Sequence, residues 1–230
     1  MLPGLRGGPV AWTRLVYSWP GHIDRIEVRP VRSSYLNSWN FAQNVHQAIL
    51  VVSTILGSWL GMQAAHELGH VLGAFLTGGT IATVVLHPLT ISRTEMIDNP
   101  HPLIVVWAGP LVGVMLPLTL WGLLELTRVP GAFVARFFAG FCLISNGAYL
   151  GAGSFVAAGD CGEMLRQGSP VWVLRVFGAV AVPAGFWLWS GQGPKFGLGD
   201  TQGMVSHPVA YGSLAIFSLL VLLGLIVDGA

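Results

Sequence analysis

Charged residues are scarce in this chain. Only 9% of its 230 residues are Asp, Glu, Lys or Arg, whereas 53% are hydrophobic and the mean hydropathy is +0.67. A soluble domain has about 25% charged residues, because its surface must face water. So few charges exclude an ordinary water-soluble globule. We therefore predict a polytopic membrane protein whose surface faces the lipid bilayer.

Cysteine and an excess of charge of one sign are also lacking. The two cysteines, Cys142 and Cys161, give no sign of a disulfide framework. The formal net charge of +1 gives no basis for binding nucleic acid. Residues 1–21 lack the short apolar core of a signal peptide, so we expect membrane insertion to depend on the first spanning segment.

Long hydrophobic runs, in contrast, are abundant. Five apolar segments are each near or above the ~20 residues that a spanning helix needs. They run approximately over 46–76, 101–124, 132–158, 171–190 and 207–227. We predict an all-α polytopic membrane protein with about five transmembrane helices. In this prediction residues 44–230 form the membrane-embedded domain, and residues 1–43 form a basic arm at the membrane interface.

The loop between the first two segments has a pattern typical of strands. Residues 80–86 are rich in β-branched side chains, His87-Pro88 interrupts them, and residues 89–94 resume an extended pattern. We predict a short β-hairpin within 79–94, and an ordinary connecting loop is the alternative.

Small residues recur at every fourth position of the first segment. The stripe consists of Gly57, Gly61, Ala65, Gly69 and Gly73. Small side chains let helices approach closely in lipid. His66 and His70 lie one position on from this stripe, about 100° around the helix, so we expect them to border a tight helix contact and to point into the bundle.

The same segment contains the sequence His66-Glu67-Leu68-Gly69-His70, although ionisable side chains are costly at membrane depth. Two histidines at positions i and i+4 face the same way on a helix and can bind one metal ion. A glutamate beside the first can polarise the metal's water and accept its proton. This H-E-x-x-H pattern indicates a zinc peptidase, and two histidines hydrogen-bonded in a bundle core are the alternative.

A catalytic zinc site needs a third protein ligand. The extended soluble pattern would place a histidine at position 76, but Leu76 stands there. The candidates are His87, Glu95, Asp98, His101, Asp160 and Glu163. We favour Asp160, because it follows a glycine-rich run where unwound backbone could bring it inward. A helix-capping role for Asp160, with Cys161 as the ligand in its place, stays open.

Three segments of the chain resemble the site-2 protease family of intramembrane zinc metalloproteases. They are "HELGHVLGAFLTGG", then "WAGPLVG" at 107–113, and "GDCGEML" at 159–165. The second is similar to the Ala-Gly-Pro segment of the family's next helix, and the third to the segment that carries the third zinc ligand. Their order and approximate separation agree with the family over about residues 45–170.

This resemblance implies roles for particular residues. It implies that His66, His70 and Asp160 bind Zn²⁺ and that Glu67 is the general base. It also implies a membrane-associated β-hairpin, to which a substrate could add as an extended strand. The nearest counterpart of a family asparagine is Asn146, which lies farther from the aspartate and without the family's proline. We carry Asn146 as a candidate substrate-binding residue.

Two further features differ from the family pattern. No PDZ-like insertion interrupts the predicted helices, so selection of substrates by such a domain is not expected. The Lys and Arg residues divide eight to three between the two sides, which favours a cytoplasmic N-terminus and places the hairpin outside. The family's hairpin usually faces the cytosol, so the sequence leaves the membrane orientation open.

The sequence as a whole predicts an intramembrane zinc metalloendopeptidase of the cell (plasma) membrane. Its partners would be membrane-protein substrates and the lipid bilayer, as in regulated intramembrane proteolysis, and its oligomeric state is left open. One alternative is a non-catalytic relative that binds or regulates other membrane proteins. Another is a transporter or channel with a path of ionisable residues, but few such residues lie near membrane depth.

Overall fold

A computed structural model of the protein describes residues 41–201 and 203–228. In chain order its main elements are α1 (Phe41–Thr77), β1 (Thr80–Val85), β2 (Arg93–Asp98), α2 (Pro102–Leu126), α3 (Ala132–Val156), α4 (Gly159–Arg166), α5 (Val171–Trp189) and α6 (His207–Asp228). Two short 3₁₀ turns, η2 (Gly193–Phe196) and η3 (Gly199–Thr201), join α5 to α6. The predicted basic arm, 1–43, lies outside the described residues except for its last three, which begin α1.

Five of these helices are long and apolar enough to cross a membrane, namely α1, α2, α3, α5 and α6. Their outer faces expose large apolar side chains such as Phe75, Val180 and Trp187, which are 80%, 65% and 69% exposed. Exposed apolar surface on this scale is stable in lipid and not in water. The predicted fold class is therefore confirmed, and the chain is an integral membrane protein.

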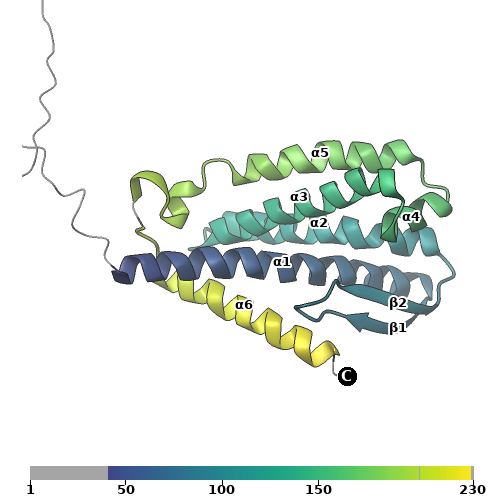
Figure 1. Ribbon diagram of the computed structural model, residues 1–230, viewed down its shortest axis with the longest axis horizontal. Coiled ribbons are helices and arrows are strands. Elements are labelled where there is room, and N and C mark those ends of the chain that lie inside the picture. The colour runs from purple at the N-terminus through teal and green to yellow at the C-terminus, as the bar shows by residue number, and fades with distance from the viewer. Residues whose placement is uncertain (1–40, 202, 229–230) are drawn as a thin grey trace, which may run out of the picture. The chain divides into compact units, whose positions relative to one another are not determined.

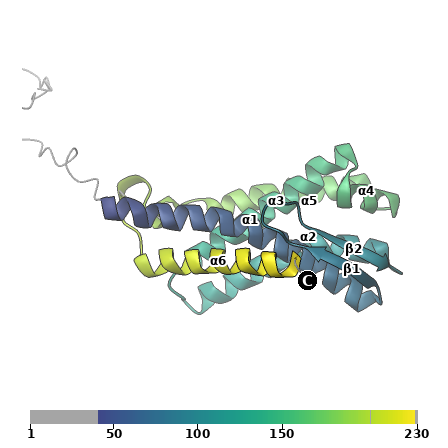
Figure 2. The same ribbon diagram turned by 60° about the horizontal axis from the view of Figure 1, so that its bottom comes forward.

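The helices pack side by side, as Figures 1 and 2 show. α1 contacts α2 on one side and α6 on another, and α3 lies against both α2 and α5. The small-residue stripe of α1 lies against both α3 and α2. Gly61 faces Phe138 of α3, whereas a Cβ added at Gly73 would lie 2.8 Å from the Cβ of Ala108 in α2. The predicted tight contact beside the H-E-x-x-H motif is thus confirmed, and α2 is the partner helix.

The predicted β-hairpin is present, but its second strand begins four residues later than predicted. β1 and β2 pair antiparallel, with Val85 opposite Arg93. Residues 89–92 lie instead in the connection, where the Thr90 N–H donates to the His87 carbonyl at 3.1 Å. The Ser92 N–H donates to Oε1 of Gln63 in α1 at 3.0 Å, so it is not available to a neighbouring strand. Ser92 is thus bound to α1, and β2 begins at the next residue, Arg93.

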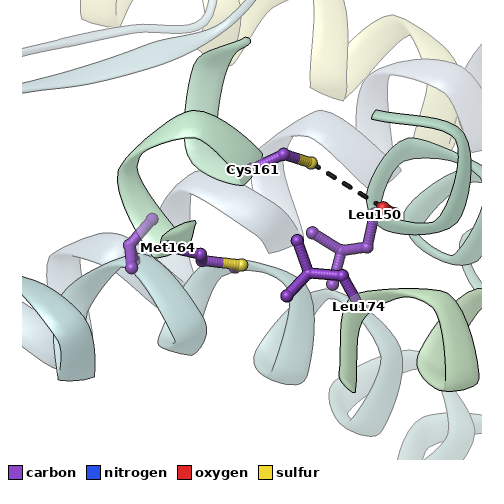
Figure 3. Close-up of a cluster of buried hydrophobic side chains, with 5 residues drawn as sticks. Leu150, Cys161, Met164 and Leu174 are labelled. Atoms are coloured by element: carbon purple, nitrogen blue, oxygen red, sulfur yellow. Dashed lines mark hydrogen bonds between the residues drawn. The ribbon is translucent and has the colours of Figure 1, made fainter. Parts of the chain in front are cut away.

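α3 ends at Val156, two residues before the predicted end of the third apolar segment. Ala157 has φ 53° and Gly159 has φ 57°, and these left-handed residues turn the chain into α4. α4 is fastened by a buried apolar cluster of Val106, Leu150, Cys161, Met164 and Leu174, which comes from four helices (Figure 3). The turn and the cluster hold α4 near the hairpin and the C-terminal part of α1 (Figure 1).

Candidate metal centre

Three side chains that the sequence singled out converge between α1 and α4. Nε2 of His66 lies 2.8 Å from Oδ2 of Asp160, and Nε2 of His70 lies 3.4 Å from the same oxygen. The two histidines are 8% and 7% exposed, and the Asp160 side chain is 24% exposed. Among the described residues, these three form the group of side chains that could hold a metal ion.

The other nitrogen of each ring is held by a second acceptor. Nδ1 of His70 lies 2.9 Å from the Val105 carbonyl oxygen, and Nδ1 of His66 lies 2.8 Å from Oδ1 of Asn146. A carbonyl oxygen and an amide oxygen can only accept a hydrogen bond, so the Nδ1 atom of each histidine must carry the hydrogen and donate it. A neutral ring then points the lone pair of Nε2 at the Asp160 carboxylate. Such an arrangement is repulsive unless a cation lies there, either a proton on a histidine or a metal ion.

The donor set fits zinc in chemistry, and its three ligand atoms all lie within 4.8 Å of one another. Two imidazoles and one carboxylate are a common set for a catalytic zinc, which keeps its fourth position for water. Zinc bonds of about 2.0–2.1 Å in a tetrahedral arrangement place ligand atoms about 3.3 Å apart. The His70–Asp160 distance of 3.4 Å already matches, and the His66–Asp160 distance of 2.8 Å must open by about 0.5 Å.

Asp160 is held from its backbone side by Tyr149 of α3. The Asp160 N–H donates to the Tyr149 hydroxyl at 3.0 Å, and a side chain at Gly159 would collide with that hydroxyl. Burial by itself raises the pKa of Asp160, but the hydrogen bonds and charges of His66 and His70 outweigh it and hold the pKa below the usual range. Asp160 is therefore an anionic group at neutral pH, as a metal ligand must be.

Glu67 is buried beside this group and is bound by the hairpin. It is 4% exposed, its Oε1 accepts the Ser92 hydroxyl hydrogen at 2.8 Å, and its Oε2 accepts that of Thr94 at 2.7 Å. Hydrogen bonds to an ionised acceptor are stronger than those between neutral groups. The hairpin therefore fixes the carboxylate of Glu67 on the side of α1 that the hairpin covers.

A cavity of about 870 Å³ joins these residues. Helices α1, α2, α3 and α4 and the hairpin all contribute to its lining. Glu67, His66, His70 and Asp160 line one part of it, and apolar side chains such as Met62 and Ile91 line another. A large, mainly apolar cavity with a few convergent polar groups is the usual form of a ligand site.

Two glycines of α2 explain why the segment "WAGPLVG" matters to this site. A Cβ at Gly109 would lie 2.5 Å from Nε2 of His70 and 2.9 Å from Nε2 of His66. A Cβ at Gly113 would lie 3.0 Å from Oδ1 of Asn146. α2 can therefore lie against the two histidines only because these positions have no side chain.

The other candidate ligands do not join the group. His87, Asp98 and His101 lie outside it, and Glu95 pairs with Arg93. Glu163 lines the cavity but accepts hydrogen bonds from Arg166 and Gln167 of its own helix.

The structure also places Asp160 and Cys161 differently with respect to the two histidines. Ala158 is the residue that caps α4, and Asp160 directs its side chain at His66. The Cys161 thiol instead lies in the apolar cluster, where it points toward the Leu150 carbonyl at 3.9 Å (Figure 3). It also lies 3.3 Å from the Tyr149 carbonyl, to which it donates. Burial raises the pKa of this thiol to about 11. Cys161 therefore lies in the apolar cluster and not among the groups that converge with His66 and His70.

Sequence reasoning missed Ser92, Thr94, Tyr149, Gly109 and Gly113 as parts of this site. The quoted segment at 107–113 includes both Gly109 and Gly113, but nothing in the sequence links Ser92 or Thr94 to Glu67.

Comparisons of the chain with protein-family models, with curated proteins and with solved structures give no match. The resemblance to site-2 proteases therefore stays a prediction, and the function has to be argued from the geometry.

Proposed function

We propose that the protein is an intramembrane zinc metalloendopeptidase. The observation that supports this most directly is the convergence of two imidazole lone pairs on one partly buried carboxylate, which calls for a cation. A second carboxylate, that of Glu67, lies on the same helix as the two histidines and lines the same cavity. His66, His70 and Asp160 would hold the zinc in this proposal, and Glu67 would be the general base.

The chemistry assigned to each residue follows from its position. Zinc bound by these three side chains would supply Lewis-acid polarisation of a water molecule and of the scissile carbonyl. Glu67 would accept the proton of the attacking water and deliver it to the leaving amine. Ser92 and Thr94 would keep the carboxylate of Glu67 in place while it does so.

The substrates in this proposal are segments of other membrane proteins. A helical peptide bond is shielded by its own backbone, so such a segment must become extended before water can attack it. β2 is the strand nearer to α4 in both views, and β1 pairs with its other edge (Figures 1 and 2). An extended segment added along β2 would lie close to Asp160 and Glu67. We also place the protein in the cell (plasma) membrane, as part of the same proposal.

The first test is the amount of zinc per polypeptide in detergent-purified protein. We expect about one zinc in the wild type, because three ligands with an open fourth position are present. His70→Ala and Asp160→Ala should lose it or bind it much more weakly. Folded wild-type protein without zinc would refute the proposal, and would mean that a proton lies between His66 and Asp160 instead.

Glu67→Gln separates catalysis from metal binding. This variant should keep its zinc, because Glu67 is not among the converging groups, and should lose cleavage of synthetic single-span membrane proteins reconstituted with it. Measurable cleavage by Glu67→Gln would contradict its role as base. Full function of this variant in cells would favour the alternative, a non-catalytic protein that binds or regulates other membrane proteins.

A further inference from the structure

His66 has a polar partner on the side of its ring that faces away from Asp160. Oδ1 of Asn146 in α3 lies 2.8 Å from Nδ1 of His66, and Asn146 is 1% exposed. The other end of the amide is also engaged, because Nδ2 donates to the Cys142 carbonyl at 2.9 Å. Both ends of this buried amide are therefore bound within the protein.

These contacts determine which way the amide points. The Cys142 carbonyl can only accept a hydrogen, so it requires the NH₂ end of Asn146. The oxygen must then face His66, and Nδ1 of His66 must donate to it. Reversing the amide would bring two oxygens together at one end. The fold of α3 thus selects the form of His66 whose free lone pair is on Nε2, toward Asp160.

We propose that Asn146 is a positioning residue for the metal centre, which holds His66 in the tautomer and orientation that zinc requires. This rests on the proposed function and assigns to Asn146 a different task from the substrate binding that the sequence suggested. Ligating histidines commonly donate their second N–H to a carboxylate or carbonyl. A neutral amide does this without adding another charged side chain at the site.

The two histidines differ in how they are held. The acceptor for His70 is the backbone carbonyl of Val105, which no substitution removes. The acceptor for His66 is a side chain, and α2 leaves room for it at Gly113. Of the two acceptors that hold the histidine rings, Asn146 is therefore the one whose contribution can be measured by replacing its side chain.

The test compares zinc affinities, measured against a chelator of known strength in detergent-purified protein. Asn146→Leu keeps the size of the side chain but has no acceptor, and we expect it to bind zinc about 10–100 times more weakly than the wild type. Asn146→Asp keeps an acceptor oxygen toward His66 but places its second oxygen against the Cys142 carbonyl, so it should bind zinc more tightly than Asn146→Leu and more weakly than the wild type. Ser154→Ala is the matched control, because it removes another buried polar group of α3 away from the site and should leave zinc affinity unchanged.

A spectroscopic measurement distinguishes positioning from a merely structural role. In zinc-loaded wild type, ¹⁵N chemical shifts of the histidine rings should show His66 bound through Nε2 with a hydrogen on Nδ1. Binding through Nδ1 would overturn the proposal even if Asn146→Leu failed to fold. A fall in thermal stability of metal-free Asn146→Leu, with zinc affinity unchanged, would overturn it as well.

Failure of this inference can be told from failure of the proposed function. Wild type without zinc refutes both, and it is seen before any Asn146 variant is compared. Wild type with one zinc, together with Asn146→Leu of equal affinity, leaves the zinc peptidase standing and refutes only the role of Asn146.

Discussion

At the scale of single residues, the candidate centre depends as much on missing side chains as on the ligands. His66 and His70 face α2 at a place where a Cβ cannot be accommodated. Gly109 leaves space for both rings, and Gly159 leaves space for the hydroxyl that holds Asp160. Interiors are close-packed, so adding one methyl group at such a contact must displace something.

Gly109→Ala should therefore damage the site directly. The new Cβ would lie 2.5 Å from the ring of His70, and the backbone of α2 cannot yield without separating from α1. Overpacking of this kind costs about 1–3 kcal/mol of stability, and here we expect zinc affinity to fall with it. Chelator competition and a thermal melt of the same samples would measure the two effects.

Gly122→Ala is the control for that experiment. Gly122 lies in the same helix, but an added Cβ there meets nothing within 4 Å. Because alanine favours helix more than glycine, by about 1 kcal/mol, this variant should be as stable as the wild type or more so, with unchanged zinc affinity. Equal zinc affinities of Gly109→Ala and Gly122→Ala would show that Gly109 is not needed at the site.

At the scale of elements, the hairpin and α1 are joined through the proposed general base. Ser92 precedes β2, Thr94 lies within it, and both hydroxyls donate to Glu67. Gln63, one turn earlier on α1, binds the Ser92 N–H. The hairpin that would receive a substrate is thus fastened to the side chain that would act on it.

The double variant Ser92→Ala/Thr94→Ala should loosen this connection. We expect residues 80–98 to exchange amide hydrogens faster, because two hydrogen bonds to a carboxylate, worth about 1.5–3 kcal/mol each, are lost. Zinc content should stay at the wild-type value, and cleavage of reconstituted substrates should fall because Glu67 is no longer oriented.

Thr90→Ala is the matched control for the hairpin. The Thr90 hydroxyl donates to the His87 carbonyl within the hairpin connection and does not contact Glu67. Its loss should leave both exchange near Glu67 and cleavage unchanged. A rise in cleavage by the double variant would instead mean that Ser92 and Thr94 restrain Glu67 and do not prepare it.

At the scale of the whole molecule, the surface of residues 41–228 is dominated by apolar side chains on the five spanning helices. Because lipid offers no hydrogen bonds, each span is a helix that satisfies its own backbone. The ionisable groups of the site lie within this bundle, where the cavity and their mutual contacts accommodate them.

Membrane extraction tests this description. We expect the protein to stay in the pellet when membranes are washed at high salt or with alkaline carbonate, because five spans cannot leave lipid for water. Detergent should be needed to release it. Release by carbonate alone would contradict the integral membrane assignment.

Much of the fold could be predicted because its signals are local. The five spans are visible as apolar runs, and the H-E-x-x-H spacing places His66 and His70 on one helical face without any reference to the rest of the chain. The small-residue stripe likewise indicated a close helix partner. The start of β2 was predicted wrongly, because Leu89 and Thr90 form a turn with His87 and Ser92 is bound to α1.

What the sequence by itself determined about this protein is thus its membrane helices, its hairpin and the paired histidines, all of which follow from spacing and hydropathy over short stretches. Only the tertiary structure decided that Asn146 holds His66, that Ser92 and Thr94 hold Glu67, and that Cys161 faces away. It also brought Asp160 to His66 across 94 positions. These contacts join residues far apart in the chain, and they depend on how closely α1, α2 and α3 pack, which no short stretch of sequence specifies.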